Sequence, residues 1–322
     1  MLGRMVMLTL LGTSASVTAL LAVVAPSYAE TLAQKLGYSE QDRLLIIHAD
    51  DVGMCHSANR ATIDALENGV ATCGSIMVPC PWFPEIAAYC REHPEIDLGL
   101  HLTLTSEWQY YRWGPVAPRP EVRGLLDEEG FMWRDEAATA AHASPAEVEK
   151  ELRAQIERAL AFGIKPTHLD SHMGAVFFRP EYFNIYIKLA EEYDIPPLIV
   201  EYRAELARHL GPDMASKFKN LVSKLKEKGF PVLDYVVPDV GGTPENKKQR
   251  YEQALRNLKP GVTEMIVHLG FADDELKGVT AKAWLRQLDY EFVTAPETKK
   301  LIEELDIKLV GWRELKKLRT AE

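Results

Sequence analysis

The chain has few of the features that mark disordered, repetitive or nucleic-acid-binding proteins. Its 20 Gly and 19 Pro are not clustered and no block of like charge reaches five residues, which excludes linkers, charged tails and low-complexity tracts. No repeat occurs at solenoid or propeller periods. The net charge of −10 argues against a nucleic-acid partner, because such partners require clustered Lys and Arg. The 322 residues, 47% of them hydrophobic, are typical of a globular protein with one large domain or two smaller ones.

Residues 1–29 contain almost no charge. Arg4 is the single charged residue there, an apolar stretch follows it, and Ser27-Tyr28-Ala29 ends the segment with small residues where a signal peptidase requires them. We therefore predict a signal peptide over 1–29 and a mature domain over 30–322. A retained membrane anchor is the alternative, because the stretch is long for a signal peptide. Both interpretations predict an exported domain, periplasmic or secreted, that contacts the membrane only if the segment is retained.

Cysteine is scarce. Cys55, Cys73, Cys80 and Cys90 are the four cysteines, and their spacing is not that of a zinc ribbon. Export would permit disulfides. A large hydrophobic core does not need them, so buried free thiols are at least as compatible with the sequence, and the pairing stays open.

From Asp42 onward, short β-branched runs alternate with longer helix-like segments, which is typical of βα units and a parallel sheet. Eight segments are predicted as strands: Leu44–Ala49, Gly74–Val78, Leu98–Leu104, Thr167–Met173, Leu198–Tyr202, Val232–Val237, Thr263–Leu269 and Lys308–Trp312. No break in composition divides them. We therefore predict a single α/β domain, a TIM-like (β/α) barrel that is regular or distorted, in preference to an open doubly wound sheet.

Helix signals occupy the gaps between these strands. Ser57 is predicted to cap a helix that ends at Gly69, and Ser144-Pro145-Ala146-Glu147 is a capping box for a helix that ends at Gly163. No Gly-x-Gly-x-x-Gly follows the first strand, so a dinucleotide site loses its main support. In a barrel, the chemistry lies at the carboxyl ends of the strands.

Polar residues gather at those ends. Five of the nine histidines lie in or beside predicted strands: His48, His101, His168, His172 and His268. Asp50 and Asp51 end the first strand, and two adjacent carboxylates repel each other and are costly to bury unless a cation lies near them. A role in capping a turn is the alternative for one of the pair.

The third and fourth strands each direct imidazoles to one face. A lone strand histidine such as His101 is more often a core residue than a ligand, unless Asp51 and His172 converge on it. In the fourth strand His168, Asp170 and His172 share a face. His172 lies nearest the carboxyl end, whereas Asp170 is placed to orient an imidazole from behind, and His168 is deeper.

One carboxylate and two imidazoles would suit Zn²⁺ or another divalent ion, with positions left for water and substrate. His268 ends the seventh predicted strand. We expect it opposite Asp50 across the barrel mouth, where an imidazole could protonate a leaving group.

Taken together, these motifs resemble those of the YdjC-like carbohydrate deacetylases, a family that includes chitooligosaccharide deacetylase. The resemblance covers nearly all of the mature chain, in family order: His-Ala-Asp50-Asp51-Val-Gly, Gly-Leu-His101-Leu-Thr-Leu, Thr-His-Leu-Asp170-Ser-His172 and Val-His268-Leu-Gly. It implies a distorted TIM-like barrel that removes acetyl groups from N-acetylated sugars or oligosaccharides with one divalent ion, Mg²⁺ or Zn²⁺. It also implies Asp51, His101 and His172 as metal ligands, Asp50 as general base and His268 as catalytic acid.

Two positions depart from the family pattern. Many members have a further histidine where this chain has Gly174, and a proline where it has Leu269. Neither position belongs to the predicted metal ligands, but both could reshape the sugar pocket. The resemblance therefore bears more firmly on the chemistry than on the sugar.

An aromatic segment, Trp108-Gln109-Tyr110-Tyr111-Arg112-Trp113, lies in the long connection after the third strand. Trp108 and Trp113 could stack on sugar rings, or the segment could be a hydrophobic plug that closes the barrel. We favour the platform, because a dry plug would leave Gln109 and Arg112 without obvious partners.

Two rival functions remain. An amidohydrolase-type barrel would require His-x-His on the first strand, where this chain has His48-Ala49-Asp50. A non-catalytic exported sugar-binding protein would have no use for a metal site with a base beside it.

Overall fold

Residues 30–203 and 212–320 are described by a computed structural model. Within these residues seven parallel strands form one sheet: β1 (Arg43–Val52), β2 (Cys73–Ile76), β3 (Leu98–Leu102), β4 (Leu169–Ser171), β5 (Tyr235–Val237), β6 (Gly261–His268) and β7 (Ile307–Leu309). The strand order is β4-β3-β2-β1-β6-β5, and β7 pairs with the first residues of β1. The predicted signal peptide, 1–29, lies outside the described residues.

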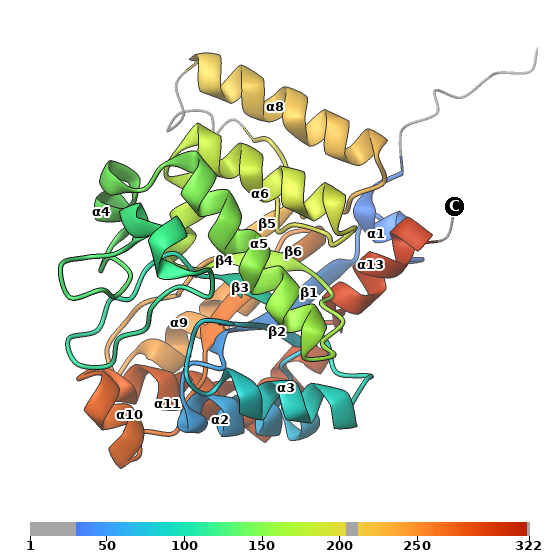
Figure 1. The fold of residues 1–322 in the computed structure, drawn as a ribbon. Helices are drawn as coiled ribbons and strands as arrows, with labels where there is room; N and C mark the ends of the chain where they lie inside the picture. The colour runs from blue at the N-terminus through green and yellow to red at the C-terminus, as the bar shows by residue number, and fades with distance from the viewer. Residues whose placement is uncertain (1–29, 204–211, 321–322) are drawn as a thin grey trace, which may run out of the picture. The chain divides into compact units, whose positions relative to one another are not determined.

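Isolated parallel bridges continue the pairing beyond the two ends of this sheet. Leu169 of β4 pairs with Pro197, and Val200 pairs with Leu233, close to the start of β5. These bridges give the sheet the curl of a distorted barrel, which confirms the predicted fold class (Figure 1). The predicted strand Leu198–Tyr202 is wrong as a regular strand, because only single bridges form there.

Twelve α-helices surround the sheet in the described part of the chain: α1 (Leu32–Lys35), α2 (His56–Asn68), α3 (Phe83–Glu92), α4 (Glu136–His142), α5 (Pro145–Ala161), α6 (Pro180–Glu192), α8 (Pro212–Glu227), α9 (Lys247–Arg256), α10 (Asp274–Val279), α11 (Ala283–Thr294), α12 (Pro296–Glu304) and α13 (Trp312–Thr320). Three short 3₁₀ helices accompany them: η1 (Arg119–Glu121), η2 (Arg123–Leu125) and η3 (His172–Phe177). The predicted capping box forms at Ser144 and Glu147. Cys55, rather than Ser57, is the N-cap of α2. None of the helices described is long and apolar enough to cross a membrane.

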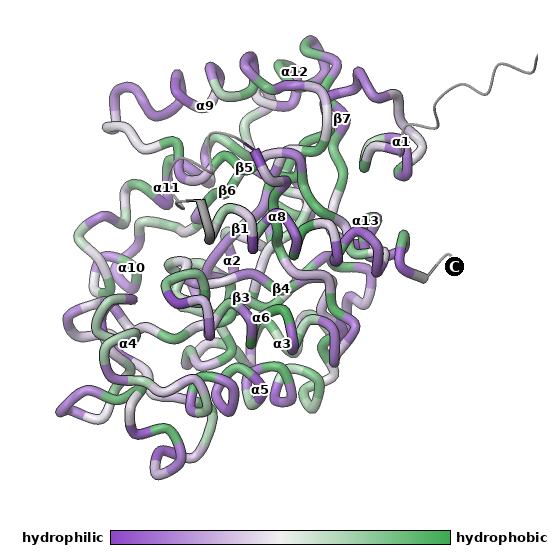
Figure 2. The backbone as a smooth tube through the Cα atoms, turned by 90° about the horizontal axis from the view of Figure 1, so that it is seen from above, coloured by the Kyte–Doolittle hydropathy of each residue, from purple (hydrophilic) through white to green (hydrophobic). Residues whose placement is uncertain are grey.

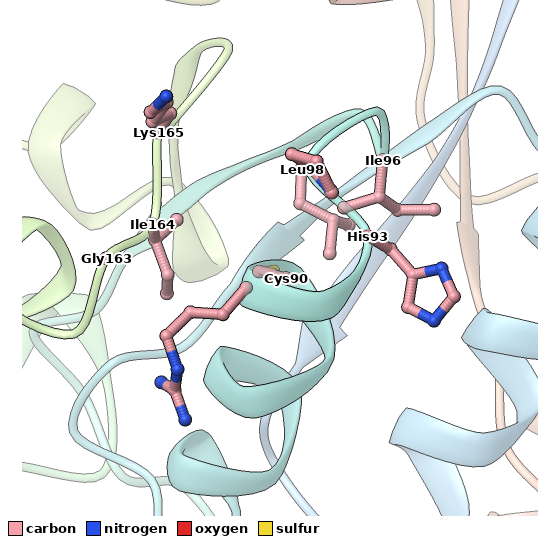
Figure 3. Close-up of a pocket in the computed structure, with 9 residues that line it drawn as sticks. Cys90, His93, Ile96, Leu98, Gly163, Ile164 and Lys165 are labelled. Atoms are coloured by element: carbon pink, nitrogen blue, oxygen red, sulfur yellow. The ribbon is translucent and has the colours of Figure 1, made fainter.

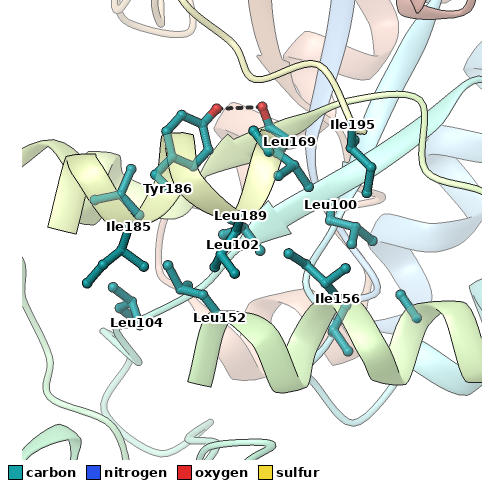
Figure 4. Packing of buried hydrophobic residues seen from close by; sticks show 14 of the residues in the cluster. Leu100, Leu102, Leu104, Leu152, Ile156, Leu169, Ile185, Tyr186, Leu189 and Ile195 are labelled. Atoms are coloured by element: carbon teal, nitrogen blue, oxygen red, sulfur yellow. Dashed lines mark hydrogen bonds between the residues drawn. The ribbon is translucent and has the colours of Figure 1, made fainter. Parts of the chain in front are cut away.

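The outward face of the sheet supplies most of the hydrophobic core. Leu100 and Leu102 of β3 pack with Leu152 and Ile156 of α5 (Figure 4). Tyr186 of α6 lies in the same cluster, and its hydroxyl donates to the Leu169 carbonyl at 2.6 Å. Figure 2 shows hydrophilic and hydrophobic residues alternating along the helices, as expected when one side of each helix faces the sheet.

Successive inward residues of β1 change from apolar to charged. Leu44 and Ile46 pack with Val262 and Trp312 and are fully buried. His48 follows two residues later, and Asp50 two residues after that, because alternate residues of a strand share one face. The polar residues on the inward face of β1 therefore lie toward the carboxyl end of that strand.

A small surface hollow of about 190 Å³ lies at the other end of the barrel, where the strands begin (Figure 3). Its lining comes from the end of α3, the first residue of β3 and residues 163–165. Because it lies at the amino ends of the strands, it is separate from the predicted site. Cys90 lines it, and all four cysteines are free and buried, as the sequence allowed.

Candidate metal centre and active site

The three predicted metal ligands, Asp51, His101 and His172, meet at one point. The Asp51 Oδ1 atom lies 3.3 Å from His101 Nε2 and 3.1 Å from His172 Nδ1. Their potential ligand atoms all lie within 4.8 Å of one another, and all three residues are buried. Parallel strands end at the same edge, which is why residues from β1, from β3 and from the position directly after β4 converge.

The backbone at Asp51 turns its side chain into the mouth. Asp51 has a φ of 65°, in the left-handed region, and the pairing of β1 with β2 shifts register between Ala49 and Val52. Aspartate tolerates this conformation better than β-branched residues do. The local irregularity lets Asp50 and Asp51 both reach the site, although consecutive strand residues would otherwise point to opposite faces.

The chemistry of this group fits a divalent cation. Asp51 Oδ1 is buried and accepts no hydrogen bond, although it lies between two imidazoles. An unpartnered buried carboxylate oxygen is costly unless a cation satisfies it. One carboxylate oxygen and two imidazole nitrogens are a donor set found in zinc sites and other divalent-metal sites.

His101 is held from behind by Asp170. Its Nδ1 lies 2.8 Å from Asp170 Oδ1, and the Ser75 hydroxyl donates to the other Asp170 oxygen at 2.8 Å. Burial lowers the pKa of His101, but Asp170 and Asp50 more than offset it and raise that pKa well above its usual value. Asp170 thus lies where the sequence analysis expected it, and it leaves His101 Nε2 directed at Asp51.

Asp50 lies beside the three predicted ligands. His48 Nδ1 donates to Asp50 Oδ1 at 2.7 Å, whereas Asp50 Oδ2 is 3.7 Å from His101 Nε2 and 3.9 Å from His268 Nε2. The prediction that His268 lies across the mouth from Asp50 is wrong. β6 is the direct neighbour of β1, and the two residues are register partners. His268 keeps a third of its side chain exposed, so it can reach a substrate.

Arg286 and Glu107 are two site residues that the sequence analysis missed. Arg286 Nη2, from α11, donates to Asp51 Oδ2 at 2.5 Å, and Glu107 Oε2 lies 3.1 Å from His172 Nε2. Arg286 and Asp289 are three residues apart in α11, and both are turned inward. For Arg286, the available sequence signal was its spacing from Asp289, because two charged residues three positions apart lie on the same side of a helix.

These two residues set the charge balance of the site. Burial raises the pKa of Asp51, but Arg286 and the two imidazoles outweigh it and hold that pKa well below its usual range. Burial lowers the pKa of His172, whereas Glu107 and Asp51 raise it, to about 9. The lowered pKa favours the ionised carboxylate of Asp51, which is the form that binds a cation.

The aromatic segment is packed more deeply than a sugar platform requires. Trp113 is 3% exposed and belongs to a hydrophobic cluster with Met54, Cys80 and Met132. Arg112, expected to lack partners in a plug, donates to Asp127 Oδ2 at 2.7 Å and to the Met132 carbonyl at 2.6 Å. The argument for a platform therefore fails for Trp113, and its burial favours the plug.

Trp108 differs from Trp113, because it is only partly buried. Its ring lies 5.5 Å from that of Trp113, and the Arg286 guanidinium lies 5.9 Å from its centroid. It therefore borders the site through Arg286. Contact with a sugar stays a prediction for this residue.

Known proteins resemble this chain along most of its length. The family described as YdjC-like protein matches residues 44–304. A carbohydrate deacetylase of Thermus thermophilus is 34% identical over 274 residues, 85% of this chain and 94% of the relative. A chitooligosaccharide deacetylase of Yersinia enterocolitica is 27% identical, over 83% of this chain and 97% of the relative. A solved structure from Enterococcus faecalis is described as a proposed cellobiose-phosphate cleavage protein. The match covers 85% of this chain and 99% of that protein, with 24% sequence identity and a TM-score of 0.71, which shows a shared fold. The extent of the family match and the identity to the Thermus protein show that the chain belongs to the YdjC-like protein family.

Proposed function

We propose that this protein is a metal-dependent deacetylase that hydrolyses the acetamide of N-acetylated sugars or oligosaccharides. The observation that carries the proposal is the unpartnered Asp51 Oδ1 atom, which lies between two imidazoles with the Asp50 carboxylate beside it. Relatives named carbohydrate deacetylase and chitooligosaccharide deacetylase support the substrate class.

Asp51, His101 and His172 would hold the divalent ion, Mg²⁺ or Zn²⁺. The non-ligating nitrogen of each imidazole already has a carboxylate partner, Asp170 for His101 and Glu107 for His172. Such partners fix ring orientation and increase the basicity of the ligating nitrogen. When bound, the ion would polarise the acetyl carbonyl and make a water molecule more acidic.

Asp50 and His268 would move the protons. Asp50 Oδ1 is occupied by His48, so Oδ2, which faces His101 and His268, is the oxygen available to take a proton from water. His268 would protonate the departing amine, because its Nε2 lies 3.9 Å from Asp50 Oδ2 and its side chain is partly exposed. The acid and the base would thus act from neighbouring strands.

Acetate release tests the proposal. The mature chain, stripped of metal and then supplied with Mg²⁺ or Zn²⁺, would be assayed on N-acetyl and O-acetyl mono- and oligosaccharides. We expect acetate only with metal and from N-acetyl substrates. His172→Ala removes a predicted metal ligand. It should therefore lower metal affinity by more than the roughly 10- to 100-fold expected when a residue that only orients a ligand is lost. The matched control is His93→Ala, which removes a partly buried histidine at the opposite end of the barrel. No acetate from any substrate with metal present, or full metal occupancy in His172→Ala, would refute the assignment.

The export signal is a separate part of the proposal. It rests on the charge-poor segment 1–29 and on its small residues at the −3 and −1 positions. Expression of the full chain with N-terminal sequencing of the exported product would test it. A mature protein that begins at Glu30 is expected, whereas an intact Met1 on membrane-associated protein would indicate an anchor.

A further inference from the structure

A buried chain of imidazoles lies beneath Asp50. His48 Nδ1 donates to Asp50 Oδ1 at 2.7 Å, and His48 Nε2 lies 2.7 Å from His168 Nε2. His168 Nδ1 lies 3.0 Å from the Thr167 hydroxyl. His48 and His168 are both fully buried, so neither can exchange these partners for water.

The contacts determine how the ring protons are distributed. A carboxylate only accepts, so His48 Nδ1 carries a proton. A single proton fits between the two facing Nε2 atoms, and the surrounding charge assigns it to His48, whose Nε2 is 3.6 Å from Asp170 Oδ2. Burial lowers the pKa of His48, but Glu264, Asp50 and Asp170 raise it, to about 9. His48 is therefore an imidazolium that donates from both nitrogens.

His168 is the neutral partner. Burial and the positive charge of His48 hold the pKa of His168 well below its usual value. Its Nε2 accepts from His48, and its Nδ1 proton is left for the Thr167 hydroxyl. Every ring nitrogen of the pair thus has a partner, which is the condition for burying polar groups at low cost.

Packing holds this pair in place. The His168 ring stacks on Trp312, with centroids 4.8 Å apart and planes 18° apart. The Trp312 indole N–H donates to Glu264 at 2.6 Å, which fixes the indole in turn. On the other side, a Cβ at Gly99 would lie 2.6 Å from the His168 ring, so no larger residue fits there without displacing the ring. The imidazole chain is therefore anchored far from solvent.

We propose that His48 is a positioning residue for Asp50, and that His168 in turn positions His48. His48 occupies Asp50 Oδ1 and leaves Oδ2 facing the space between His101 and His268. The imidazolium also compensates the charge of Asp50, Asp170 and Glu264. This role rests on the proposed function, because it assumes that Asp50 is the general base.

The arrangement can be tested without activity. Nitrogen NMR of the mature, zinc-loaded protein with ¹⁵N-labelled histidine should show His48 with both ring nitrogens protonated and His168 neutral with a proton on Nδ1. The signal missing from His48→Asn identifies His48. A neutral His48 at pH 7 would overturn the inference.

Kinetics would test the positioning role. His48→Leu removes both donors at similar volume, and we expect kcat to fall about 10- to 100-fold with KM and bound metal unchanged. His48→Asn keeps an N–H that can reach Asp50 and should recover most of kcat. Wild-type kcat in folded His48→Leu, or His48→Asn no better than Leu, would contradict the role.

A control variant tests whether a change in kcat is specific to His48, and the NMR measurement does not depend on the proposed function. His93→Asn changes a partly buried histidine that stacks on Tyr89 and lies near the exposed Glu95, far from the site, and it should leave kcat unchanged. If wild-type protein releases no acetate from any substrate, the proposed function fails. The NMR result would still establish or refute the His48–His168 arrangement in that case.

Discussion

The two faces of β1 and β3 differ in what their side chains do. Facing outward, Ile47 and Leu100 are fully buried among aliphatic side chains that meet the surrounding helices. Facing inward near the carboxyl ends, His48 and His101 are equally buried, but each contacts a carboxylate. Burial alone therefore does not distinguish the core of this barrel from its site. The distinction lies in whether a buried atom needs a polar partner.

The difference has an energetic consequence. Each fully buried aliphatic side chain on the outer face contributes about 1.5–3 kcal/mol of hydrophobic stabilisation. Buried charges on the inner face contribute little net stability even when paired, because desolvation offsets most of the attraction. Removing one partner of such a pair does destabilise the fold, because the other charge stays buried. We therefore expect outer-face substitutions to alter stability without altering catalysis, and isosteric inner-face substitutions such as Asp→Asn to alter catalysis most.

The largest difference between the effect on catalysis and the effect on stability is expected at Asp50. Asp50→Asn keeps the shape of the inner face but loses the oxygen proposed to accept a proton, so kcat should fall about 10²- to 10⁴-fold while the metal stays bound. Acetate release and metal content measured on the same preparation would check this. Asp64→Asn on α2 is the control. Near-normal rates in Asp50→Asn would mean that another group is the base, with Asp170 the next candidate.

Trp113 tests whether the aromatic segment belongs with the core or with the site. As a buried plug residue, its replacement by Ala should lower the free energy of unfolding by about 3–5 kcal/mol. Trp108→Ala, at a partly exposed ring, should cost less. Thermal melting of both variants, with the saccharide KM of Trp108→Ala, would measure the contrast. An unchanged melting temperature in Trp113→Ala would restore the platform interpretation.

Leu100 tests the outer face directly. Leu100→Ala leaves a cavity against α5 and should lower the free energy of unfolding by about 2–5 kcal/mol. Metal affinity and kcat should change little, although the neighbouring residue is His101. Denaturant titration and metal titration of one variant would provide both values. A loss of metal affinity comparable to that of His172→Ala would break the separation between the two faces.

The smallest effect is expected where the aromatic segment is tied to the following loop. Burial raises the pKa of Asp127, but Arg112 and the Phe131 N–H outweigh it and lower that pKa. Because the folded-state pKa lies below the unfolded value of about 3.9, this stabilisation is complete above that value and is lost as the pH falls through the folded-state pKa.

Asp127→Asn should therefore lower stability by about 1 kcal/mol or less at neutral pH and reduce its acid dependence. Urea denaturation between pH 3 and 7 would measure both effects. Glu128→Gln, an exposed neighbour, is the control. An unchanged acid dependence in Asp127→Asn would show that the Arg112 pair does not contribute.

Much of the barrel could be predicted because strand periodicity is local. β1, β3 and β6 were expected close to their observed bounds, since long runs of β-branched and aliphatic residues leave few alternatives. The strand predicted over Leu198–Tyr202 does not form as a regular strand, because this segment makes only isolated bridges. Three residues at the strand ends, Asp51, His101 and His172, were expected to converge and do so. Their roles stay predictions until metal is measured.

The sequence by itself determined that His48, Asp50 and His101 face inward near the carboxyl ends of their strands, because the alternation of a strand allows each residue only one of two faces. Asp51 reaches the site through the irregular backbone at the end of β1, which alternation does not predict. The tertiary structure alone decided which groups meet there. The Arg286–Asp51 pair, the His172–Glu107 contact and the direct neighbourhood of Asp50 and His268 depend on how helices and strands distant in the chain dock. The burial of Trp113 depends on partners that its local sequence does not contain. Local geometry constrains direction, whereas contact between distant segments is set by packing of the whole domain.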